Sequence, residues 1–476
     1  MNDIARSRPL RMGPGERTLP APMSREIPLA PQYLPILGHI APMLMGPPWD
    51  ITEQWLRTHG PTLRFKIPGA EYIVSSDTEV VRQVLLTNAD NYVKDIRSMA
   101  PFLDLLGQGL LSSDGPLWKR QRATLAKAFR IDALRNVADV TRRAVDRTSV
   151  TLDEHARSGE PVDIGALFRR LTLQVIAEAT LSMTPEESDE VLPRLYEPLV
   201  AEANRRVWLP MRARLPLPAR FHYDRSVREL NEFLAAKIDA RWRLHQADPK
   251  RPATDMLDML LRSFAGEPWT PEVARLLSDE LKTMLFAGHD TSSAMLTWTL
   301  HTLTKHPQHL ARLQAAADEA FVGEAMPDYE TLKRLDYAGA CLKEALRIYN
   351  IVPVVTRKAL AEDRFGDYHV PAGCLVMLHL QALHKDPEQW PEPEEFRPER
   401  FQSESQGNAW RWLPFVNGPR SCVGQHFSLL EAKIVLSLLT QRFDFTPEPG
   451  NSDARHRFNI PVGPKGRITM RVRRRG

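Results

Sequence analysis

One cysteine lies in a segment whose residue types and spacing suit chemistry. The segment runs Phe415-Val416-Asn417-Gly418-Pro419-Arg420-Ser421-Cys422-Val423-Gly424. Because Asn417-Gly418-Pro419 cannot continue a helix or a central strand, we predict a turn there. Apolar residues follow at helical spacing, at Phe427, Leu430, Ile434 and Leu438. We therefore expect Cys422 at a helix N-terminus, where free N–H groups and the helix dipole favour a thiolate. A thiolate there could be a nucleophile, a redox sensor or a metal ligand.

A second unusual segment lies in the middle of a long apolar helix. The pattern predicts this helix from about Asp279 to Lys305, ended by Pro307. Its middle is Ala287-Gly288-His289-Asp290-Thr291-Ser292, although Gly288 costs about 1 kcal/mol relative to alanine in a helix interior. One interpretation is two helices joined by a polar hinge. The other is a helix opened at its middle, which leaves Asp290 and Thr291 to relay protons in a pocket.

Three further motifs carry charge and are weak signals on their own. Glu344 and Arg347 are three residues apart and share a helix face. Arg400 lies in the segment Phe396-Arg397-Pro398-Glu399-Arg400-Phe401, which is typical of a charged loop. Trp118 begins a helix with positive residues that alone indicate a solvated face: Lys119, Arg120, Arg122, Lys127 and Arg130.

The elements that must position these residues are mostly helical. Helical patterns dominate from Trp118 to about residue 350, and short β-like runs follow at Leu375–His379 and Ile468–Val472. Near the N-terminus we predict a helix at Trp49–Thr58, a hairpin of Leu63–Ile67 with Glu71–Ser75, and a helix at Thr78–Thr87 capped by Asp77. Residues 96–115 are expected to be an apolar loop. No linker divides the chain, so we expect a single domain over 28–476.

Composition narrows the class of protein. The 476 residues are 43% hydrophobic and 26% charged, which is typical of a globular protein with an ample core. A net charge of +4 argues against a nucleic-acid binder, and we expect no transmembrane anchor because no apolar run is long enough. Three cysteines indicate a reducing compartment, and hence the cytoplasm. Residues 1–27 are predicted to be a flexible arm rich in proline and arginine.

The cysteine segment resembles the haem-binding loop of the cytochrome P-450 family, Phe-x-x-Gly-x-Arg-x-Cys-x-Gly, with every fixed position filled. The other marks of the family follow in the right order: Trp118 to Arg122, Ala287 to Thr291, Glu344-x-x-Arg347, Pro353 to Arg357, and Pro398-Glu399-Arg400-Phe401. The resemblance covers roughly residues 28 to 470 and is closest to bacterial-type members without a fused reductase. It implies a mainly α fold with a smaller β portion, in which haem lies between the long distal helix and the cysteine loop.

The resemblance assigns roles around haem b. Cys422 would be the axial thiolate of the iron, and Phe415 would limit solvation of the sulfur. Gly418 and Gly424 would let the backbone approach the porphyrin. The haem propionates would be held by Trp118, Arg122, Arg357 and Arg420. Glu344, Arg347 and Arg400 would form a structural charge network. A metal site shared with His426 is the alternative for Cys422, but no further cysteine or histidine cluster supplies the remaining ligands of a zinc site.

On the distal side the resemblance gives Gly288, Asp290 and Thr291 catalytic roles, with Asp290 and Thr291 delivering protons during O₂ activation. This acid–alcohol pair favours an O₂-dependent monooxygenase that hydroxylates or epoxidises a hydrophobic substrate such as a fatty acid or terpenoid. The alternative is a haem-thiolate protein that rearranges hydroperoxides or serves as a sensor. Because Ala287 replaces the glutamate of some fatty-acid hydroxylases, covalently bound haem is not expected.

Partners and substrate are implied in outline. Electrons from NAD(P)H would come through an external ferredoxin or flavodoxin, and the positive helix after Trp118 could contribute to its docking face. We expect a monomer. The substrate pocket would be apolar, lined by Met99, Phe102, Leu103, Met284, Leu285, Ile351, Val352, Val354, Val355 and Ile460. Arg205 and Arg206 could meet a substrate carboxylate but are expected to form a solvated face, and the nearby 208–218 region might touch a membrane.

Overall fold

The structure is a computed structural model, and it describes residues 25–129, 131–216, 218–264, 268–321, 332, 335–402, 409–449 and 459–476. Within helices, the side chains of 96–99, 127, 131–135, 208 and 210 are also left undescribed. The predictions for residues 1–24, Arg130 and residue 458, and those for the Met99 and Lys127 side chains, therefore lie outside the described part. The end of the predicted arm is packed, since Ile27 is buried and the Arg25 N–H donates to the Asp367 carbonyl at 2.9 Å.

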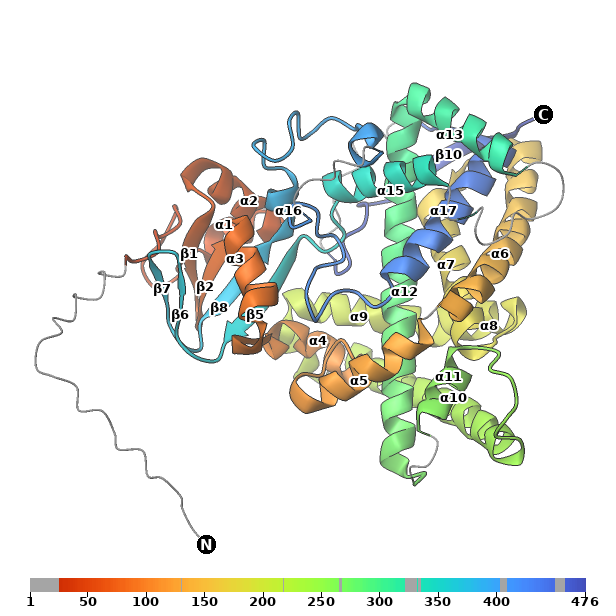
Figure 1. Ribbon diagram of the computed structural model, residues 1–476, viewed down its shortest axis with the longest axis horizontal. Helices are drawn as coiled ribbons and strands as arrows, with labels where there is room; N and C mark the ends of the chain where they lie inside the picture. Colours follow the sequence, from red (N-terminus) through yellow and green to blue (C-terminus); the bar gives the residue numbers. More distant parts are fainter. Residues whose placement is uncertain are drawn as a thin grey trace, which may run out of the picture.

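The main sheet has five strands in the order β1-β2-β8-β5-β3. Their bounds are β1 Thr62–Ile67, β2 Ala70–Ser75, β3 Tyr92–Lys94, β5 Val354–Ala359 and β8 Leu375–His379. The predicted hairpin of β1 with β2 and the strand at β8 are confirmed. β8 pairs parallel with β2 and antiparallel with β5, which pairs in turn with β3. Figure 1 shows this sheet at one side of the molecule, away from most of the helices.

Two smaller sheets complete the β portion. One joins β4 (Val162–Asp163), β10 (Thr469–Arg474) and β9 (Phe443–Pro447), and the other pairs β6 (Asp363–Phe365) with β7 (Tyr368–Val370). The strand predicted at Ile468–Val472 is therefore confirmed with shifted ends, because β10 continues to Arg474 opposite β9.

Helices make up most of the chain. Their bounds are α1 Ile40–Met43, α2 Pro48–His59, α3 Thr78–Arg82, α4 Ile96–Leu106, α5 Gly115–Ala128, α6 Ile131–Ser158, α7 Ile164–Leu181, α8 Pro185–Leu195, α9 Glu197–Trp208, α10 Pro218–Ala247, α11 Met256–Ser263, α12 Pro271–Lys305, α13 Pro307–Ala320, α15 Asp336–Ile348, α16 Leu380–His384 and α17 Gln425–Arg442. Asp77 caps α3 as predicted, with its carboxylate accepting from the Glu79 and Val80 N–H groups, and a π-helical turn continues over Gln83–Thr87.

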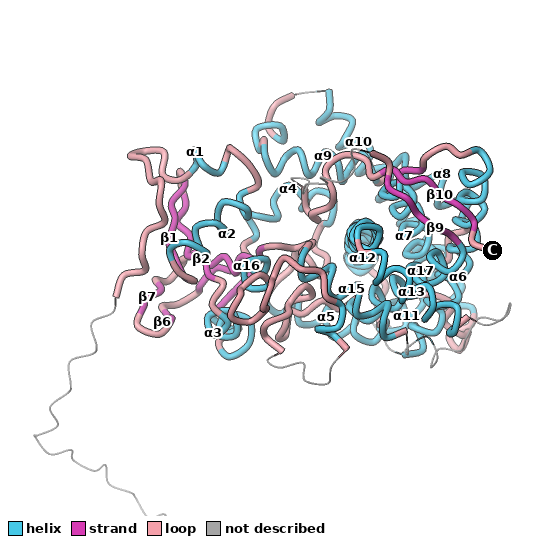
Figure 2. Tube along the Cα trace, turned by 90° about the horizontal axis from the view of Figure 1, so that it is seen from above, coloured by secondary structure: helices cyan, strands magenta, loops and turns pink. Residues whose placement is uncertain are grey.

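Helix α12 is continuous, so the interpretation as two helices joined by a hinge is wrong. It also begins earlier than predicted, because Thr270 caps it by accepting from the Val273 N–H and Pro271 fits its first position. Helix α7 packs closely along it. A Cβ at Gly288 would come within 2.8 Å of the Ile176 side chain, so the glycine at this position permits the close approach. Figure 2 looks along α12, with α7, α15 and α17 around it.

The predicted loop at 96–115 is wrong in its first half, which forms α4 despite Pro101. Phe102, Leu105 and Leu106 are fully buried, and the Phe102 ring packs 5.2 Å from that of Phe286 on α12. The apolar burial of one helix face outweighs the cost of an internal proline. The loop begins at Gly107, where α12 holds it: the Gln108 N–H donates to Asp279 at 2.9 Å and the Leu110 N–H to Glu280 at 3.1 Å.

Candidate active site

The cysteine loop has a tightly defined backbone. The Cys422 N–H donates to the Phe415 carbonyl at 2.8 Å, which closes the turn, and α17 begins shortly after at Gln425. Val416 and Gly418 both have left-handed φ angles, of 57° and 81°. A Cβ at Gly418 would lie 2.1 Å from the Leu85 carbonyl oxygen, so only glycine fits there. The loop is thus locked both to itself and to the segment after α3.

The Cys422 thiol is accessible, and desolvation by the surrounding protein raises its pKa above that of a free thiol. The N–H groups of Gly424 and Gln425 and the charge of Arg122 act in the opposite direction without overcoming burial. The helix terminus therefore favours the thiolate, as expected, but its effect is smaller than that of burial. A bound cation would be needed to keep the sulfur deprotonated, because coordination removes the thiol proton.

Helix α12 has one open face at its middle. Of residues 277–303, all of which the structure describes, those that are not buried are Ala287, Gly288, Asp290 and Thr291. Ala287 is exposed even though it lies halfway along a helix that crosses the molecule (Figure 1). The Thr291 hydroxyl donates to the Ala287 carbonyl, within the helix. The structure therefore brings three of the predicted catalytic residues, Gly288, Asp290 and Thr291, to one accessible surface.

A cluster of cations lies beside the cysteine loop. Lys94 on β3 is directly opposite Arg357 on β5, and Arg420 from the cysteine loop joins them. The indole of Trp118 lies under this cluster, 5.1 Å from the Arg420 guanidinium and 5.9 Å from the Lys94 ammonium. Asp114 accepts from Arg420 at 2.7 Å and from the Lys94 N–H at 2.6 Å, and a second carboxyl, that of Glu280, acts electrostatically on Lys94.

The cluster has more positive charge than its own residues neutralise. Burial lowers the pKa of Arg357 to about 10, with Arg420 acting in the same direction, and burial lowers the pKa of Lys94 to about 8. The one described side-chain hydrogen bond of Arg357 goes to the neighbouring Thr356 carbonyl, and the Arg420 Nε atom is buried without a partner. Because buried cations are costly unless paired, this arrangement fits a bound dianion such as the two carboxylates of haem.

Arg122 lies four residues after Trp118 on α5. Its guanidinium donates to the Ser421 hydroxyl at 3.2 Å and acts electrostatically on Cys422, whereas Trp118 contacts the Arg420 guanidinium. Three of the four residues predicted to hold carboxylates thus belong to the cationic cluster, and the fourth contacts the cysteine loop next to Cys422.

The predicted charge network is present and fully buried at its centre. Arg347 donates from Nε and Nη2 to the two oxygens of Glu344, both at 2.8 Å, and neither side chain is exposed. Arg400 donates to the same carboxylate at 3.2 Å. Arg347 also donates to the His384 carbonyl, and the His384 ring accepts from the Leu413 N–H at 2.7 Å. The network therefore connects α15 to the chain that leads into the cysteine loop.

Comparison with known proteins decides the family. The model of the family described as Cytochrome P450 matches residues 28–466, which is most of the chain. The chain belongs to the cytochrome P450 family. A solved structure, the cytochrome P450DA heme domain, superposes with a TM-score of 0.82 at 26% identity, covering 95% of this chain and 99% of the other. The expected P450 fold is confirmed.

Curated P450 relatives span plants and animals. The protein LUTEIN DEFICIENT 5, chloroplastic, from Arabidopsis thaliana is 30% identical, with 83% of this chain and 68% of the relative covered. Cytokinin hydroxylase from the same plant is 29% identical, covering 78% and 72%. Cytochrome P450 3A11 from Mus musculus is 27% identical, covering 88% and 85%.

The family fixes the general activity. This P450 is a haem-thiolate monooxygenase, an oxidoreductase that uses haem b and takes electrons from NAD(P)H through partner proteins. The cationic cluster, the accessible thiol and the open face of α12 fit that cofactor. No helix among the described residues has the length and apolar character needed to span a membrane.

Lys94 and Asp114 were not predicted from the sequence. Lys94 lies far from Arg357 in the chain, and their meeting depends on the pairing of β3 with β5. The Lys94 ammonium also donates to the carbonyls of Leu110, Leu111 and Ser113, which fixes its position. A short β run of alternating residues ending in lysine is too common a pattern to indicate such a site.

Two arginines expected near the substrate entrance differ sharply in their exposure to solvent. Arg205 is exposed, as a solvated face requires, but Arg206 is buried. The Arg206 guanidinium pairs with Asp104 at 3.1 Å and Glu202 at 3.4 Å. The expectation of a solvated face is therefore wrong for Arg206, whose charge is already neutralised.

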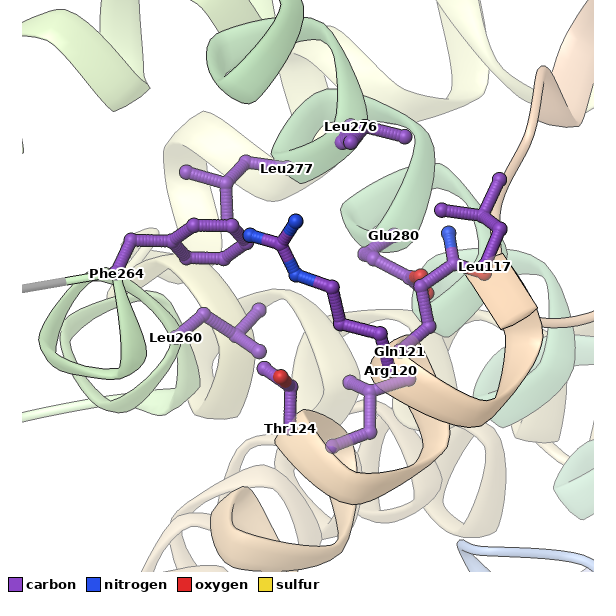
Figure 3. Close-up of a pocket in the computed structure, with 10 residues that line it drawn as sticks. Leu117, Arg120, Gln121, Thr124, Leu260, Phe264, Leu276, Leu277 and Glu280 are labelled. Atoms are coloured by element: carbon purple, nitrogen blue, oxygen red, sulfur yellow. The ribbon is translucent and has the colours of Figure 1, made fainter. Parts of the chain in front are cut away.

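The pocket in Figure 3 lies between α5, α11 and α12, away from the open face of α12. The Arg120 side chain reaches into it, with its guanidinium 5.4 Å from the centre of the Phe264 ring. Arg120, predicted as part of a solvated positive face, is thus partly directed toward its own protein. Arg120 nevertheless stays exposed overall, as does Lys119, in agreement with the predicted solvated face.

Proposed function

We propose that Asp290 and Thr291 transfer protons on the distal side of the haem and that Cys422 is the iron ligand on the proximal side. The observation that supports this most directly is the open face of α12, where a carboxylate and a hydroxyl are the accessible polar side chains of an otherwise buried stretch. When bound, haem supplies the activation of O₂.

The polar groups on α12 have distinct tasks in this proposal. Thr291 already donates its hydroxyl hydrogen to the Ala287 carbonyl, so its oxygen lone pairs face outward and can accept a proton-bearing water. Asp290 keeps about a fifth of its side-chain surface exposed and can take up a proton at Oδ1 or Oδ2 and pass it on. Gly288 carries no polar group, and its role is to let α7 support the helix from behind.

Replacing Thr291 tests this relay. Thr291→Ala removes the hydroxyl from the open face and should divert NAD(P)H consumption from product to released peroxide. Thr299→Ala is a matched control, because Thr299 is buried on the same helix and its hydroxyl donates to the Met295 carbonyl in the same way. Equal coupling in Thr291→Ala and the native protein would contradict the assigned roles.

We propose a hydrophobic substrate that is hydroxylated or epoxidised. Five of the predicted pocket residues support this because they are apolar and partly open: Leu103, Val352, Val354, Val355 and Ile460. Phe102 and Leu285, also predicted to line the pocket, are fully buried in the protein core and do not support it. No charged side chain from this set would meet a polar substrate, and Arg206 is already paired. Screening fatty acids, terpenoids, steroids and aromatics for spectral shifts of the holoprotein tests the substrate class, and a shift confined to charged, water-soluble compounds would contradict it.

We propose a ferredoxin or flavodoxin as electron donor, docking in part at Lys119 and Lys127 of α5. The exposure of Lys119, on the helix that also supplies Trp118 and Arg122 to the site, supports this surface. Lys119→Glu with Lys127→Glu should slow reduction and weaken its salt dependence. Lys465→Glu, an exposed lysine in the C-terminal segment, is the control. Unchanged reduction rates in the double variant would rule out this docking surface.

We also propose that the protein is a monomer in the cytoplasm. A reducing compartment of this kind is in keeping with three free cysteines.

A further inference from the structure

A buried polar cluster lies behind the open face of α12. Helices α4, α9 and α10 meet there (Figures 1 and 2). Tyr196 precedes α9 and is fully buried, and its ring packs edge-on against that of His289 at 6.3 Å. Tyr223 of α10 is buried as well, with the Arg206 guanidinium 3.8 Å from the centre of its ring. The Tyr223 hydroxyl acts electrostatically on that of Tyr196, which joins the two pairs into one cluster of Tyr196, Tyr223, His289 and Arg206.

The members of this cluster have polar atoms without protein partners. These atoms are the hydroxyls of Tyr196 and Tyr223, both ring nitrogens of His289 and one terminal nitrogen of Arg206. Buried polar atoms in native proteins are nearly always hydrogen-bonded, and where protein partners are missing, ordered waters with two to four such contacts take their place. Five such atoms in one region indicate a site for internal water rather than a packing defect.

The cluster extends to solvent at one end. Arg206 pairs with Asp104 on α4, whose side chain is 63% exposed, and with Glu202, which also accepts from Arg212 at 2.9 Å. Protons can therefore enter at exposed carboxylate oxygens. At this end the charges are paired, so the positive charge of Arg206 does not itself repel a proton arriving along the water molecules.

The other end of the cluster reaches the proposed relay. The His289 Nδ1 atom lies 3.6 Å from an oxygen of Asp290, which belongs to the open face of α12. Burial raises the pKa of Tyr196, and the negative charge of Asp290 raises it further, so the tyrosine hydroxyl lies within electrostatic reach of that carboxylate. Burial also raises the pKa of Tyr223. Both hydroxyls stay protonated and can donate one hydrogen bond while accepting another.

We propose that Tyr196, Tyr223 and His289, bridged by buried waters, form a route that carries protons from solvent at Asp104 to Asp290. Each step is a hop in which a hydroxyl or water takes up one proton and releases another, so no tyrosinate forms and no charge accumulates. The route rests on the proposed role of Asp290 and Thr291, which it resupplies. Tyr196 and Tyr223 act through Asp290 and are positioning residues, not catalytic ones.

The first test is a high-resolution crystal structure of the holoprotein, which does not depend on turnover. We expect ordered waters bonded to the Tyr196 and Tyr223 hydroxyls and to the His289 ring. A dry cluster, with the hydroxyls bonded directly to one another or to nothing, would overturn the route without touching the roles of Asp290 and Thr291.

The second test removes single hydroxyls. Tyr196→Phe and Tyr223→Phe keep the packed rings, and Tyr337→Phe is the control, since Tyr337 is buried on α15 with its hydroxyl bonded to His309 at 2.8 Å. We expect about tenfold slower product formation with a larger solvent isotope effect in the first two, less than the roughly 10²- to 10⁴-fold loss of a removed acid–base group, because water partly replaces the hydroxyl. Substrate affinity should not change.

Different results would contradict the Asp290–Thr291 relay and the route that supplies it with protons. If Thr291→Ala uncouples turnover but both tyrosine variants match Tyr337→Phe in rate and isotope effect, the route is wrong and the relay stands. If Thr291→Ala also leaves coupling intact, the relay itself is wrong. Native thermal midpoints and spectra of the tyrosine variants confirm that each has folded.

Discussion

Lys94 and Arg357 lie directly opposite each other on antiparallel strands β3 and β5, two cations facing one another in the interior. Like charges in directly opposed positions destabilise a sheet. The pair therefore makes structural sense only with a negative partner, and the single carboxylate of Asp114 is shared with Arg420. We propose that the carboxylates of haem complete the balance, in which case these residues would link strand pairing to cofactor binding.

Arg357→Gln should weaken haem binding. Hydrogen bonds to charged groups contribute about 1.5–3 kcal/mol, so we expect haem affinity to fall by roughly 10- to 100-fold. The rate of haem transfer to an acceptor protein measures this. Lys358→Gln is the matched control, because Lys358 is the next residue on β5 and is exposed. Equal haem retention in the two variants would show that Arg357 does not hold the cofactor.

Glu344→Gln should destabilise the whole fold. The Glu344–Arg347 pair is completely buried, and removing one partner of such a pair costs about 3–5 kcal/mol because the other charge stays buried. Urea unfolding followed by circular dichroism should show a lower free energy of unfolding. Glu229→Gln, which removes the partly exposed partner of the exposed Arg225, should leave the free energy of unfolding nearly unchanged. A neutral effect of Glu344→Gln would mean that the network is not structural.

Glu431 should make stability fall as pH rises. This α17 residue is fully buried, and burial raises the pKa of its carboxyl from 4.5 to about 8, against the opposing effect of the Ser292 hydroxyl. Between these values the folded protein holds a proton that the unfolded chain has released, so the free energy of unfolding decreases with pH by up to about 1.4 kcal/mol per unit. Glu431→Gln should reduce this slope, most clearly above pH 7, because burial also raises the pKa of Glu280 to about 7 and this carboxyl contributes below that pH; Glu319→Gln, an exposed change, should leave the slope as it is. The test is to measure the free energy of urea unfolding as a function of pH in the native protein and in both variants.

Gly418→Ala should lower the free energy of unfolding by more than the cost of placing an alanine in a left-handed conformation. Gly373 has nearly the same φ, 79° against 81°, but open space where its Cβ would lie, whereas a Cβ at Gly418 would meet the Leu85 carbonyl oxygen. Gly373→Ala should therefore cost about 1–2 kcal/mol and Gly418→Ala distinctly more, with loss of haem as the cysteine loop shifts. Equal thermal midpoints would indicate that the loop can move away from Leu85 freely.

The sequence predicts those parts of the site that are contiguous in the chain. The Cys422 loop, the Ala287–Thr291 segment and the Glu344–Arg347 pair each depend on neighbours within one turn or helix, so spacing alone identifies them. Lys94 depends on the register between distant strands, and Arg206 on a helix, α4, that Pro101 and the following glycines concealed.

The same distinction applies to the fold. The β1–β2 hairpin was predictable because its turn residues separate two alternating runs. The continuity of α12 was not, because the cost of Gly288 is local, whereas the packing of Ile176 against it comes from α7. The net pKa of Cys422 likewise depends on burial by loops that are distant in sequence, which outweighs the local effect of the helix terminus.

The absorption spectrum of the reduced, CO-bound holoprotein tests the central claim most directly. The account predicts the red-shifted Soret band of thiolate-ligated haem. The band should be lost in Cys422→Ser and kept in Cys374→Ser, a change of a cysteine that packs against the core of the main sheet just before β8. A folded native protein with the spectrum of a neutral or imidazole ligand, or a Cys422→Ser variant that keeps the red-shifted band, would contradict it.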